Sequence, residues 1–199
     1  MQSTETNREG RKRFAAFLAA LDEAVSNKGD IIPATVSYVE ALVRDIVSRD
    51  DWLDPQFAKP HPEYYQQYLL YCDPQRRFSV VSFVWGPGQE TPIHDHTVWG
   101  CVGMLRGQEI CQEYEISGNR LIPQAEQRLE PGQTVSFGPE RGDVHRVRNA
   151  YDDRVSVSIH VYGDDIGAVK RHVYQPDGSV KSFISGYSNH VLPNYWGTN

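Results

Sequence analysis

The stretch GQETPIHDH, residues 88–96, decides what fold and what chemistry we expect of this chain. His94 and His96 are two residues apart, so on an extended strand both side chains point to one face and Asp95 points to the other. Two imidazoles that converge in this way can bind one metal ion, and iron, zinc, copper and nickel all accept such ligands. The spacing therefore predicts a metal site without choosing the ion.

A second stretch, GDVHRVRN at residues 142–149, adds a third histidine, His145, after a glycine turn. A strand that returns through a barrel could bring His145 beside His94 and His96, and three histidines on one side would leave the opposite coordination positions open. On its own, a His-Asp-His segment is as readily a surface feature of a strand. The two stretches together favour a metal site.

The chain reads as two helices followed by many short strands. Apolar residues recur at helical spacing before residue 50, in the sets Phe14, Phe17, Leu18, Leu21 and Val39, Leu42, Val43, Ile46, Val47. Residues 51–65 hold three prolines and predict an irregular connection. From residue 78 onward, short β-branched and aromatic runs separated by Gly, Pro and Asp favour a barrel or sandwich, and Asp177-Gly178 predicts a hairpin.

Composition excludes several classes of function. The 199 residues carry a formal charge of −6, which argues against a nucleic-acid partner or an anionic membrane surface and favours a small-molecule substrate. No apolar stretch approaches the roughly 20 residues of a membrane helix, and the first residues lack the apolar core of a secretory signal. We therefore expect a cytoplasmic protein. Its cysteines, Cys72, Cys101 and Cys111, predict reduced thiols.

The two histidine stretches resemble the paired motifs of the cupin superfamily. Matching positions are Gly88, His94, His96 and Gly107 in the first motif and Gly142, His145 and Asn149 in the second. The turn from Pro139 to Gly142 is one residue longer than the pattern. This resemblance implies a mainly β fold, a double-stranded β-helix or jelly-roll barrel, in a single domain over 1–199. A helical segment at 1–64 would pack on a barrel at 65–199 that carries the metal site.

The chain departs from the cupin pattern where the first motif has a glutamate. That position falls on Gly100 or Cys101, depending on the spacing. The expected ligands are therefore three neutral imidazoles with no carboxylate. A divalent ion so held keeps its full charge, which favours an incoming thiolate.

A three-histidine cupin without an acidic ligand resembles the cysteine dioxygenase family of thiol dioxygenases. The segment Ser158-Ile159-His160-Val161-Tyr162 fits that family's Ser-x-His-x-Tyr pattern. The resemblance implies Fe(2+), a small thiol and O2, with Ser158 orienting His160 and His160 hydrogen-bonding the hydroxyl of Tyr162, which then reaches the metal-bound ligands as a donor. The alternative is an ordinary strand with its polar face in water.

Gln67 and Arg171 are the residues that we expect to bind substrate. Gln67 stands where animal-type members of the family have an arginine, so the chain resembles the glutamine-type bacterial branch, exemplified by 3-mercaptopropionate dioxygenases. A glutamine lacks the charged fork that grips a carboxylate, and in that branch an arginine after the third histidine, here Arg171, supplies the charge. The alternative for Gln67 is an exposed amide, and the alternative for Arg171 is a solvated surface charge.

Strand alternation also predicts which way the cysteine nearest the site, Cys101, points. If alternation continues from His94, then Gly100 faces the metal, Cys101 points away, and no thioether joins Cys101 to Tyr162. Isolated histidines are more often surface or capping residues than ligands, so we leave out His61, His172 and His190. Near the end of the chain, aromatic residues either cover the pocket or simply pack, namely Tyr187, Tyr195 and Trp196.

The expected activity is oxidation of a small carboxylate-bearing thiol to a sulfinic acid, with 3-mercaptopropionate as the first choice of substrate and L-cysteine as the second. One rival is a non-catalytic metal-cupin that binds a ligand. Another is a different cupin enzyme, such as a zinc isomerase or an aromatic-ring dioxygenase, which usually keeps the missing carboxylate. The sequence leaves the oligomeric state open.

Overall fold

Two helices open the chain, as the apolar spacing predicts. The computed structural model describes residues 2–26, 33–140 and 142–194, with side chains from residue 8 onward. Helix α1 spans Gln2–Ser26 and α2 spans Pro33–Val47. A short 3-10 helix, η1 (Pro55–Ala58), follows within the proline-rich stretch, where the Asp54 side chain accepts a hydrogen bond from the Gln56 N–H and caps its first turn. The apolar stripes of both long helices are buried, apart from the half-buried Leu42.

The strands begin after this helical part. In the described residues they are β1 (Gln66–Cys72), β2 (Ser79–Trp85), β3 (Ile93–His94), β4 (Gly100–Arg106), β5 (Glu109–Ser117), β6 (Arg120–Leu129), β7 (Thr134–Phe137), β8 (His145–Asn149), β9 (Ser156–Tyr162), β10 (Arg171–Tyr174) and β11 (Val180–Phe183).

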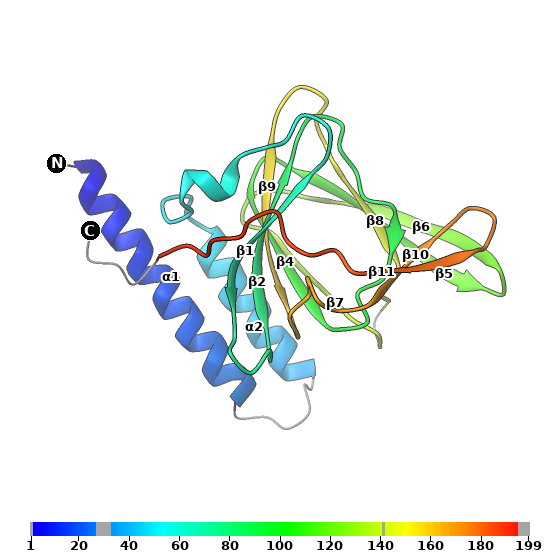
Figure 1. Ribbon diagram of the computed structural model, residues 1–199, viewed down its shortest axis with the longest axis horizontal. Helices are drawn as coiled ribbons and strands as arrows, with labels where there is room; N and C mark the ends of the chain where they lie inside the picture. The colour runs from blue at the N-terminus through cyan, green and yellow to red at the C-terminus, as the bar shows by residue number, and fades with distance from the viewer. Residues whose placement is uncertain (1, 27–32, 141, 195–199) are drawn as a thin grey trace.

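Two antiparallel sheets form the body of the molecule (Figure 1). One has the order β1-β2-β9-β4-β7 and the other the order β11-β10-β3-β8-β5-β6. The chain passes repeatedly from one sheet to the other, which is how a jelly-roll closes around an interior. The predicted mainly β cupin fold is confirmed. So is the Asp-Gly hairpin, since Gln175 and Ser179 are hydrogen-bonded across the turn between β10 and β11.

Strands β1 and β6 were not expected from the sequence. Strand β6 lies at the edge of its sheet, and every residue except the last, Leu129, is exposed or half-buried. It also contains Pro123, which lies beside a shift of register with β5. Edge strands and bulges are the places where a sheet accepts proline, because one side of the strand needs no ladder hydrogen bond. Such a strand carries little of the alternation that reveals a half-buried one.

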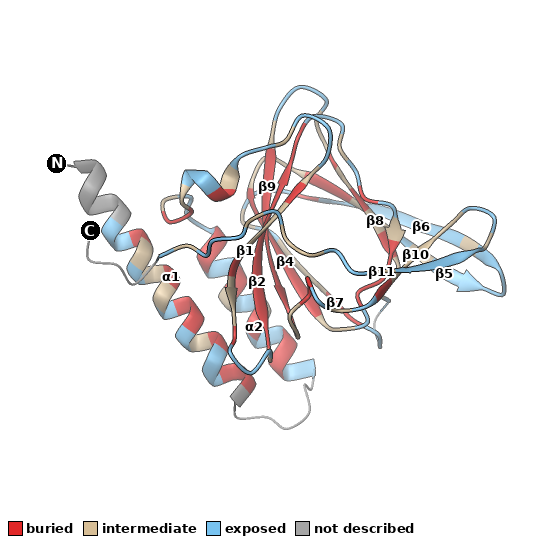
Figure 2. Cartoon of the chain, viewed as in Figure 1, coloured by how far each residue is buried: buried red, intermediate tan, exposed pale blue. Residues whose placement is uncertain are grey.

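Helix α2 lies against strands β4 and β7, and α1 lies against α2 (Figure 1). Gly103 of β4 permits the close contact, since a Cβ atom there would lie 2.6 Å from Val43 Cγ1. The helices thus bury one face of the five-stranded sheet, and its central strands β2, β9 and β4 are buried along nearly their whole length (Figure 2). We call the two apolar clusters the helix-side core, which includes Phe14, Val43 and Cys101, and the barrel core, which includes Phe137 and Tyr162.

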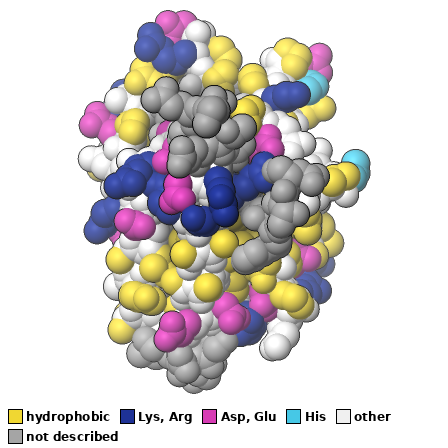
Figure 3. Space-filling view, turned by 90° about the vertical axis from the view of Figure 1, so that its left-hand side faces the viewer, with side chains coloured by type: hydrophobic (Ala, Val, Ile, Leu, Met, Phe, Trp, Pro, Cys, Tyr) yellow, Lys and Arg dark blue, Asp and Glu magenta, His cyan; other side chains and the backbone are white. Residues whose placement is uncertain are grey.

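The outer face of the helices carries charges of both signs. Lys and Arg side chains lie beside Asp and Glu side chains across this face (Figure 3), and Arg13 forms an ion pair with Asp51. The charge on this face is therefore mixed rather than of one sign. The absence of a nucleic-acid partner stays a prediction. Within the described residues, no helix has the length and apolar character needed to cross a membrane. A cytoplasmic location stays a prediction.

Candidate metal centre and its pocket

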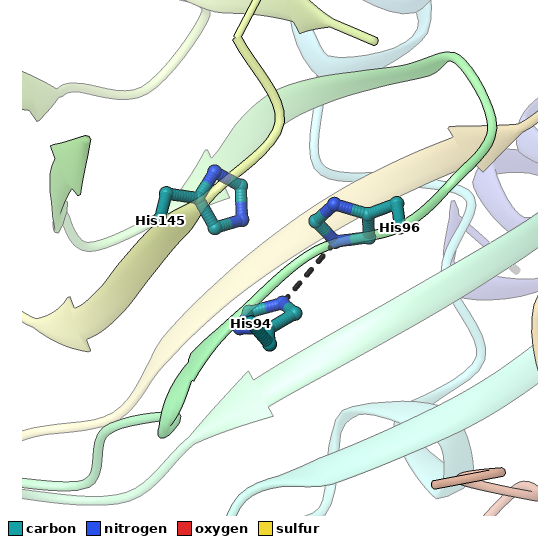
Figure 4. Close-up of side chains that lie close together, drawn as sticks. All are labelled: His94, His96 and His145. Atoms are coloured by element: carbon teal, nitrogen blue, oxygen red, sulfur yellow. Dashed lines mark hydrogen bonds between the residues drawn. The ribbon is translucent and has the colours of Figure 1, made fainter. Parts of the chain in front are cut away.

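Three buried histidines converge in the interior of the barrel (Figure 4). His94 ends β3 and pairs directly with His145, the first residue of β8. His96 follows two residues later on the same segment. The ligand atoms of the three rings all lie within 4.8 Å of one another, and each residue is buried. The structure therefore brings together the three residues that the sequence proposed as metal ligands.

The path between His94 and Gly100 differs from the expected strand. Strand β3 contains only Ile93 and His94, so His96 lies beyond its end, and Thr97 adopts a left-handed backbone conformation with φ of 60°. The expectation of regular alternation from His94 to Gly100 is therefore wrong. The reason is topological: His94 belongs to one sheet and Gly100 to the other, and the chain must turn between them.

Hydrogen bonds fix the rings of His94 and His96. His94 Nδ1 lies 3.0 Å from the Pro92 carbonyl oxygen, and His96 Nδ1 lies 2.9 Å from Asp143 Oδ1. A carbonyl and a carboxylate only accept, so each Nδ1 carries the hydrogen and each Nε2 presents a lone pair. These two Nε2 atoms are only 3.2 Å apart. Two lone pairs at this separation repel unless a cation binds both, so the residues present fit a metal ion.

The same rings are neutral at ordinary pH. Burial lowers the pKa of His94 to about 4, and burial together with the neighbouring histidines holds the pKa values of His96 and His145 well below the usual range. Metal binding needs unprotonated imidazole. The barrel interior therefore keeps these three side chains in the form that binds a metal.

No carboxylate joins the three histidines in the potential metal cluster found among the described residues. Gly100 pairs with Phe137 and Tyr162, and a Cβ atom at Gly100 would lie 2.4 Å from the Phe137 ring, which borders the cavity. Gly100 thus faces the barrel interior, as expected. The adjacent Cys101 lies in the helix-side core, whereas Tyr162 lies in the barrel core, so the two side chains are on opposite faces of the sheet.

Strand β9 carries the continuous chain of hydrogen bonds that the Ser-x-His-x-Tyr pattern suggested. Ser158 Oγ lies 2.9 Å from His160 Nε2, and His160 Nδ1 lies 2.8 Å from the hydroxyl oxygen of Tyr162. Trp85 Nε1 donates to Ser158 Oγ at 3.1 Å, and the ring of Phe83 stacks on His160. Burial lowers the pKa of His160 to about 3 and raises the pKa of Tyr162, so both groups are neutral.

A cavity of about 660 Å³ opens beside the histidines. Its lining includes the residues proposed from the sequence except Ser158, which lies behind His160: His94, His96, His145, His160, Tyr162, Gln67 and Arg171. The lining residues include no aspartate or glutamate. The pocket therefore combines potential metal ligands with one cationic side chain and no fixed negative charge.

Arg171 is an unusual cation because it is only 4% exposed. Its Nη2 donates to Ser185 Oγ at 2.5 Å and its guanidinium lies over the Phe183 ring, while Nε is buried without a hydrogen-bond partner. No carboxylate forms an ion pair with it in the described parts of the chain. Burial lowers the pKa of Arg171, although an arginine stays charged. A buried charge without a partner marks a site for an anion.

Gln67 lies on β1, on the wall of the same cavity. Its Nε2 donates to the Gly186 carbonyl at 2.6 Å, and its backbone N–H donates to Ser188 Oγ. The segment around Gly186 is therefore tied to β1, and Tyr187 from this segment also lines the cavity. Tyr187 is part of the cavity wall, while Tyr195 and Trp196 lie outside the described residues.

Sequence reasoning missed three residues of the site. Asp143 holds His96, Phe137 packs against the His96 ring with centroids 4.4 Å apart, and Glu109 is a buried carboxyl group whose Oε2 has no hydrogen-bond partner among the described residues. Only Asp143 had a signal, because it lies two residues before His145 in the second histidine stretch. Nothing in the sequence indicates which histidine it contacts. The histidines left out of the site stay outside it: His172 bonds Asp95, and His61 stacks on Tyr64.

Comparison with known proteins gives one family and distant relatives. Residues 5–176 match the profile of the family described as cysteine dioxygenase type I. The cysteine dioxygenase type 1 of Danio rerio is 26% identical over 169 residues, which cover 81% of this chain and 77% of that protein. The Rattus norvegicus protein of the same name is 29% identical over 90 residues, or 43% of this chain. That match spans 44% of the rat protein.

Solved structures with a similar fold are also distant. The protein TT1209 from Thermus thermophilus is 19% identical with a TM-score of 0.44, over 55% of this chain and 92% of that chain. An RmlC-like cupin protein from Desulfovibrio desulfuricans is 20% identical with a TM-score of 0.39, over 53% of this chain and 87% of the other.

Proposed function

This chain belongs to the cysteine dioxygenase type I family, and on that premise we propose that it is a non-heme Fe(II) thiol dioxygenase. Its substrate is a small thiol that bears a carboxylate, and its product is the sulfinic acid. One observation carries the proposal: among the described residues, three neutral imidazoles without a carboxylate border a cavity that also holds a buried arginine with no ion-pair partner. Such a site suits a substrate with a sulfur at one end and an anion at the other.

His94, His96 and His145 would hold the ferrous ion, which supplies the redox chemistry for O2 and favours the thiolate form of the substrate. Both atoms of O2 are transferred to sulfur, so the thiol loses the electrons that O2 gains and no external reductant is needed. Asp143 keeps the His96 ring in the tautomer that presents Nε2. The Tyr162 hydroxyl, supported by His160 and Ser158, donates a hydrogen bond to the reacting groups.

Arg171 binds the substrate carboxylate, and Gln67 helps to position it. An arginine fork matches a carboxylate in geometry and charge, and an unpaired guanidinium inside the protein gains most from such a partner. The two ends of the substrate are then fixed, sulfur at the histidines and carboxylate at Arg171. This arrangement lowers the entropic cost of bringing the thiol to the reacting position.

3-Mercaptopropionate is the preferred substrate in this proposal, and L-cysteine is the second candidate. The two differ in an ammonium group. The residues that line the cavity include no carboxylate to accept that group, and burying an unpaired ammonium is costly. Gln67 and tyrosine hydroxyls offer only neutral acceptors. These observations favour a thiol without an amine.

Oxygen uptake by anaerobically iron-loaded protein tests the proposal directly. We expect uptake that needs both Fe(II) and a thiol, with kcat/KM highest for 3-mercaptopropionate, lower for L-cysteine and lowest for cysteamine, which has no carboxylate. Zinc-loaded protein serves as the control without redox chemistry. If none of the three thiols stimulates uptake, the protein is not a dioxygenase of small thiols, and thiol binding without turnover would indicate a ligand-binding cupin.

A further inference from the structure

The side-chain amide of Gln67 has a fixed direction at the wall of the cavity. Its Nε2 lies 2.6 Å from the Gly186 carbonyl oxygen. A carbonyl oxygen only accepts hydrogen bonds, so the amide turns its NH2 group toward Gly186 and its own oxygen, Oε1, away from it. Among the described residues, none donates a hydrogen bond to Oε1. Gln67 therefore brings an unpaired acceptor to the site.

The Gln67 side chain lies on the inner face of β1. Gln67 is directly opposite Phe83 in the pairing of β1 with β2. Residues opposite each other in a ladder share a face of the sheet. Phe83 stacks on His160, and both of these residues line the cavity together with Gln67. The unpaired acceptor thus belongs to a side chain that points into the cavity.

The backbone around Gly186 is held in place without the help of the Gln67 side chain. Ser188 exchanges two hydrogen bonds with the backbone of Gln67, one through its N–H and one through its hydroxyl. Asn189 forms a similar pair of hydrogen bonds with the backbone of Leu69. The segment after β11 is therefore tied to β1 (Figure 1), and it fixes the direction of the Gln67 amide before a ligand binds.

The same segment places Gln67 close to Arg171. Arg171 Nη2 donates to Ser185 Oγ at 2.5 Å, and Gln67 Nε2 donates to the carbonyl of the next residue, Gly186. Two side chains bonded to consecutive residues lie close together, because consecutive Cα atoms are only about 3.8 Å apart. The cavity therefore has an unpaired acceptor beside its buried cation.

This acceptor matches a hydrogen-bond donor next to the substrate carboxylate. A carboxylate bound to Arg171 brings the adjacent carbon, carbon 2, close to Gln67. 3-Mercaptopropionate has no donor on that carbon. L-Cysteine has an ammonium there, which the guanidinium repels and no carboxylate among the lining residues compensates, so it stays the poorer substrate of the two. A hydroxyl on carbon 2 donates without carrying a charge.

We propose that Gln67 Oε1 accepts a hydrogen bond from a hydroxyl on carbon 2 of the substrate, so that the site takes 2-hydroxy-3-mercapto acids. The simplest of these is 2-hydroxy-3-mercaptopropionate. The hydroxyl only binds, and the reaction still transfers both atoms of O2 to sulfur. As a statement about turnover, this inference rests on the proposed thiol dioxygenase activity. As a statement about binding, it is independent of that activity.

The geometry also predicts that the site distinguishes two enantiomers, because carbon 2 of 2-hydroxy-3-mercaptopropionate is a stereocentre. The sulfur is held at the histidines and the carboxylate at Arg171. In this position the hydroxyl of one enantiomer points toward Gln67, and the hydroxyl of the other points away from it. Only the first enantiomer gains the hydrogen bond.

Binding to the full chain loaded with Zn(II) measures recognition without oxidation. Calorimetry compares 3-mercaptopropionate with each enantiomer of 2-hydroxy-3-mercaptopropionate. We expect one enantiomer to bind about 3- to 10-fold more tightly than 3-mercaptopropionate, which is the range for one net hydrogen bond. The other enantiomer should bind no more tightly than 3-mercaptopropionate. Equal Kd values for the two enantiomers would overturn the inference.

Substitution of Gln67 tests the residue itself. Gln67→Leu removes the acceptor, so the Kd values of the two enantiomers should become nearly equal. Gln127→Leu, an exposed change on β6, should keep the wild-type ratio of these values. Each ratio is measured within one protein, so a smaller fraction of folded, metal-loaded chain does not change it. A wild-type ratio in Gln67→Leu would overturn the inference.

Oxygen uptake by the iron-loaded enzyme gives a separate result. Values of kcat/KM should follow the order of binding, with the favoured enantiomer ahead of 3-mercaptopropionate. Discrimination between the enantiomers in binding, without oxygen uptake from any thiol, supports the role of Gln67 and contradicts the proposed function alone. Uptake with 3-mercaptopropionate, without discrimination between the enantiomers, contradicts this inference alone.

Discussion

The most informative single residue is Arg171, because a buried guanidinium without an anionic partner is rare in folded proteins. Ser185 and Phe183 orient the side chain, but neither neutralises it. Its charge is therefore available to a ligand in the cavity. The proposed carboxylate contact explains both the burial and the missing partner.

Replacing Arg171 by methionine should weaken binding of acidic thiols selectively. Hydrogen bonds to a charged group contribute about 2 kcal/mol, so KM for 3-mercaptopropionate should rise by roughly 30-fold. The activity toward cysteamine, which has no carboxylate, should change little. Steady-state oxygen uptake measures both, with Arg120→Met, an exposed arginine, as the control. Equal losses for the two thiols would contradict a carboxylate contact.

Asp143 acts on the metal through His96. The carboxylate accepts from His96 Nδ1 and from the backbone N–H groups of His96 and Thr97, so it holds both the ring and the turn that follows. Asp143→Asn should reduce metal affinity by about 10- to 100-fold. Competition with a coloured chelator measures this affinity. Asp153→Asn removes an exposed carboxylate and should leave the metal affinity unchanged. Equal affinities for the wild type and both variants would show that Asp143 does not support the metal site.

At the scale of elements, the alternation of residues along strand β4 places one glycine beside the metal site and another beside the helices. Gly100 faces the barrel interior, where Phe137 contacts the His96 ring, and Gly103 faces helix α2. Both glycines leave space that a neighbouring side chain fills. One strand therefore controls the approach of Phe137 to the metal site on one face and the approach of the helices on the other.

Alanine at each glycine should separate these roles. Gly103→Ala would place a methyl group against Val43 and Val47, and overpacking of this kind costs roughly 1–3 kcal/mol of unfolding free energy while leaving metal content unchanged. Gly100→Ala should push Phe137 against His96 and lower metal affinity. Urea unfolding and metal analysis of both variants check the pair. Loss of metal in Gly103→Ala with full occupancy in Gly100→Ala would reverse the assignment of faces.

At the scale of the whole molecule, the barrel excludes water from ionisable groups that would be charged outside it. The helices cover one face of the five-stranded sheet, and the second sheet closes over the other face (Figure 2). Burial then lowers the pKa values of His94 and His160 and raises that of Glu109. Global stability is thereby linked to pH through residues of the site.

The contribution of Glu109 has a definite sign. Its folded pKa, about 7, lies above the ordinary value of 4.5, so its stabilising contribution is full below pH 4.5 and is lost as pH rises through 7. The unfolding free energy of Glu109→Gln, relative to wild type, should therefore increase by roughly 3 kcal/mol between acid and alkaline pH. Urea unfolding across this range measures the difference, with Glu115→Gln expected to run parallel to wild type. A constant difference between Glu109→Gln and wild type would mean that Glu109 titrates normally.

The features that depend on local spacing were predictable from the sequence alone. Helical periodicity predicted both helices, alternation predicted that Ser158, His160 and Tyr162 share a face, and the histidine motifs predicted the three residues that converge. Each of these follows from the geometry of one element, or from a motif whose members the sequence contains.

Contacts between residues of distant elements become visible only in the folded chain. Asp143 contacts His96 rather than the nearby His145, Phe137 packs against the same ring, and the chain turns at Thr97 between two sheets. These contacts depend on the order and register of the strands. The two-residue alternation of a strand predicts which face a side chain occupies but not which strands lie beside it. The same reason applies to Arg171: the sequence shows its charge, but only the closed barrel buries that charge with no carboxylate paired to it among the described residues.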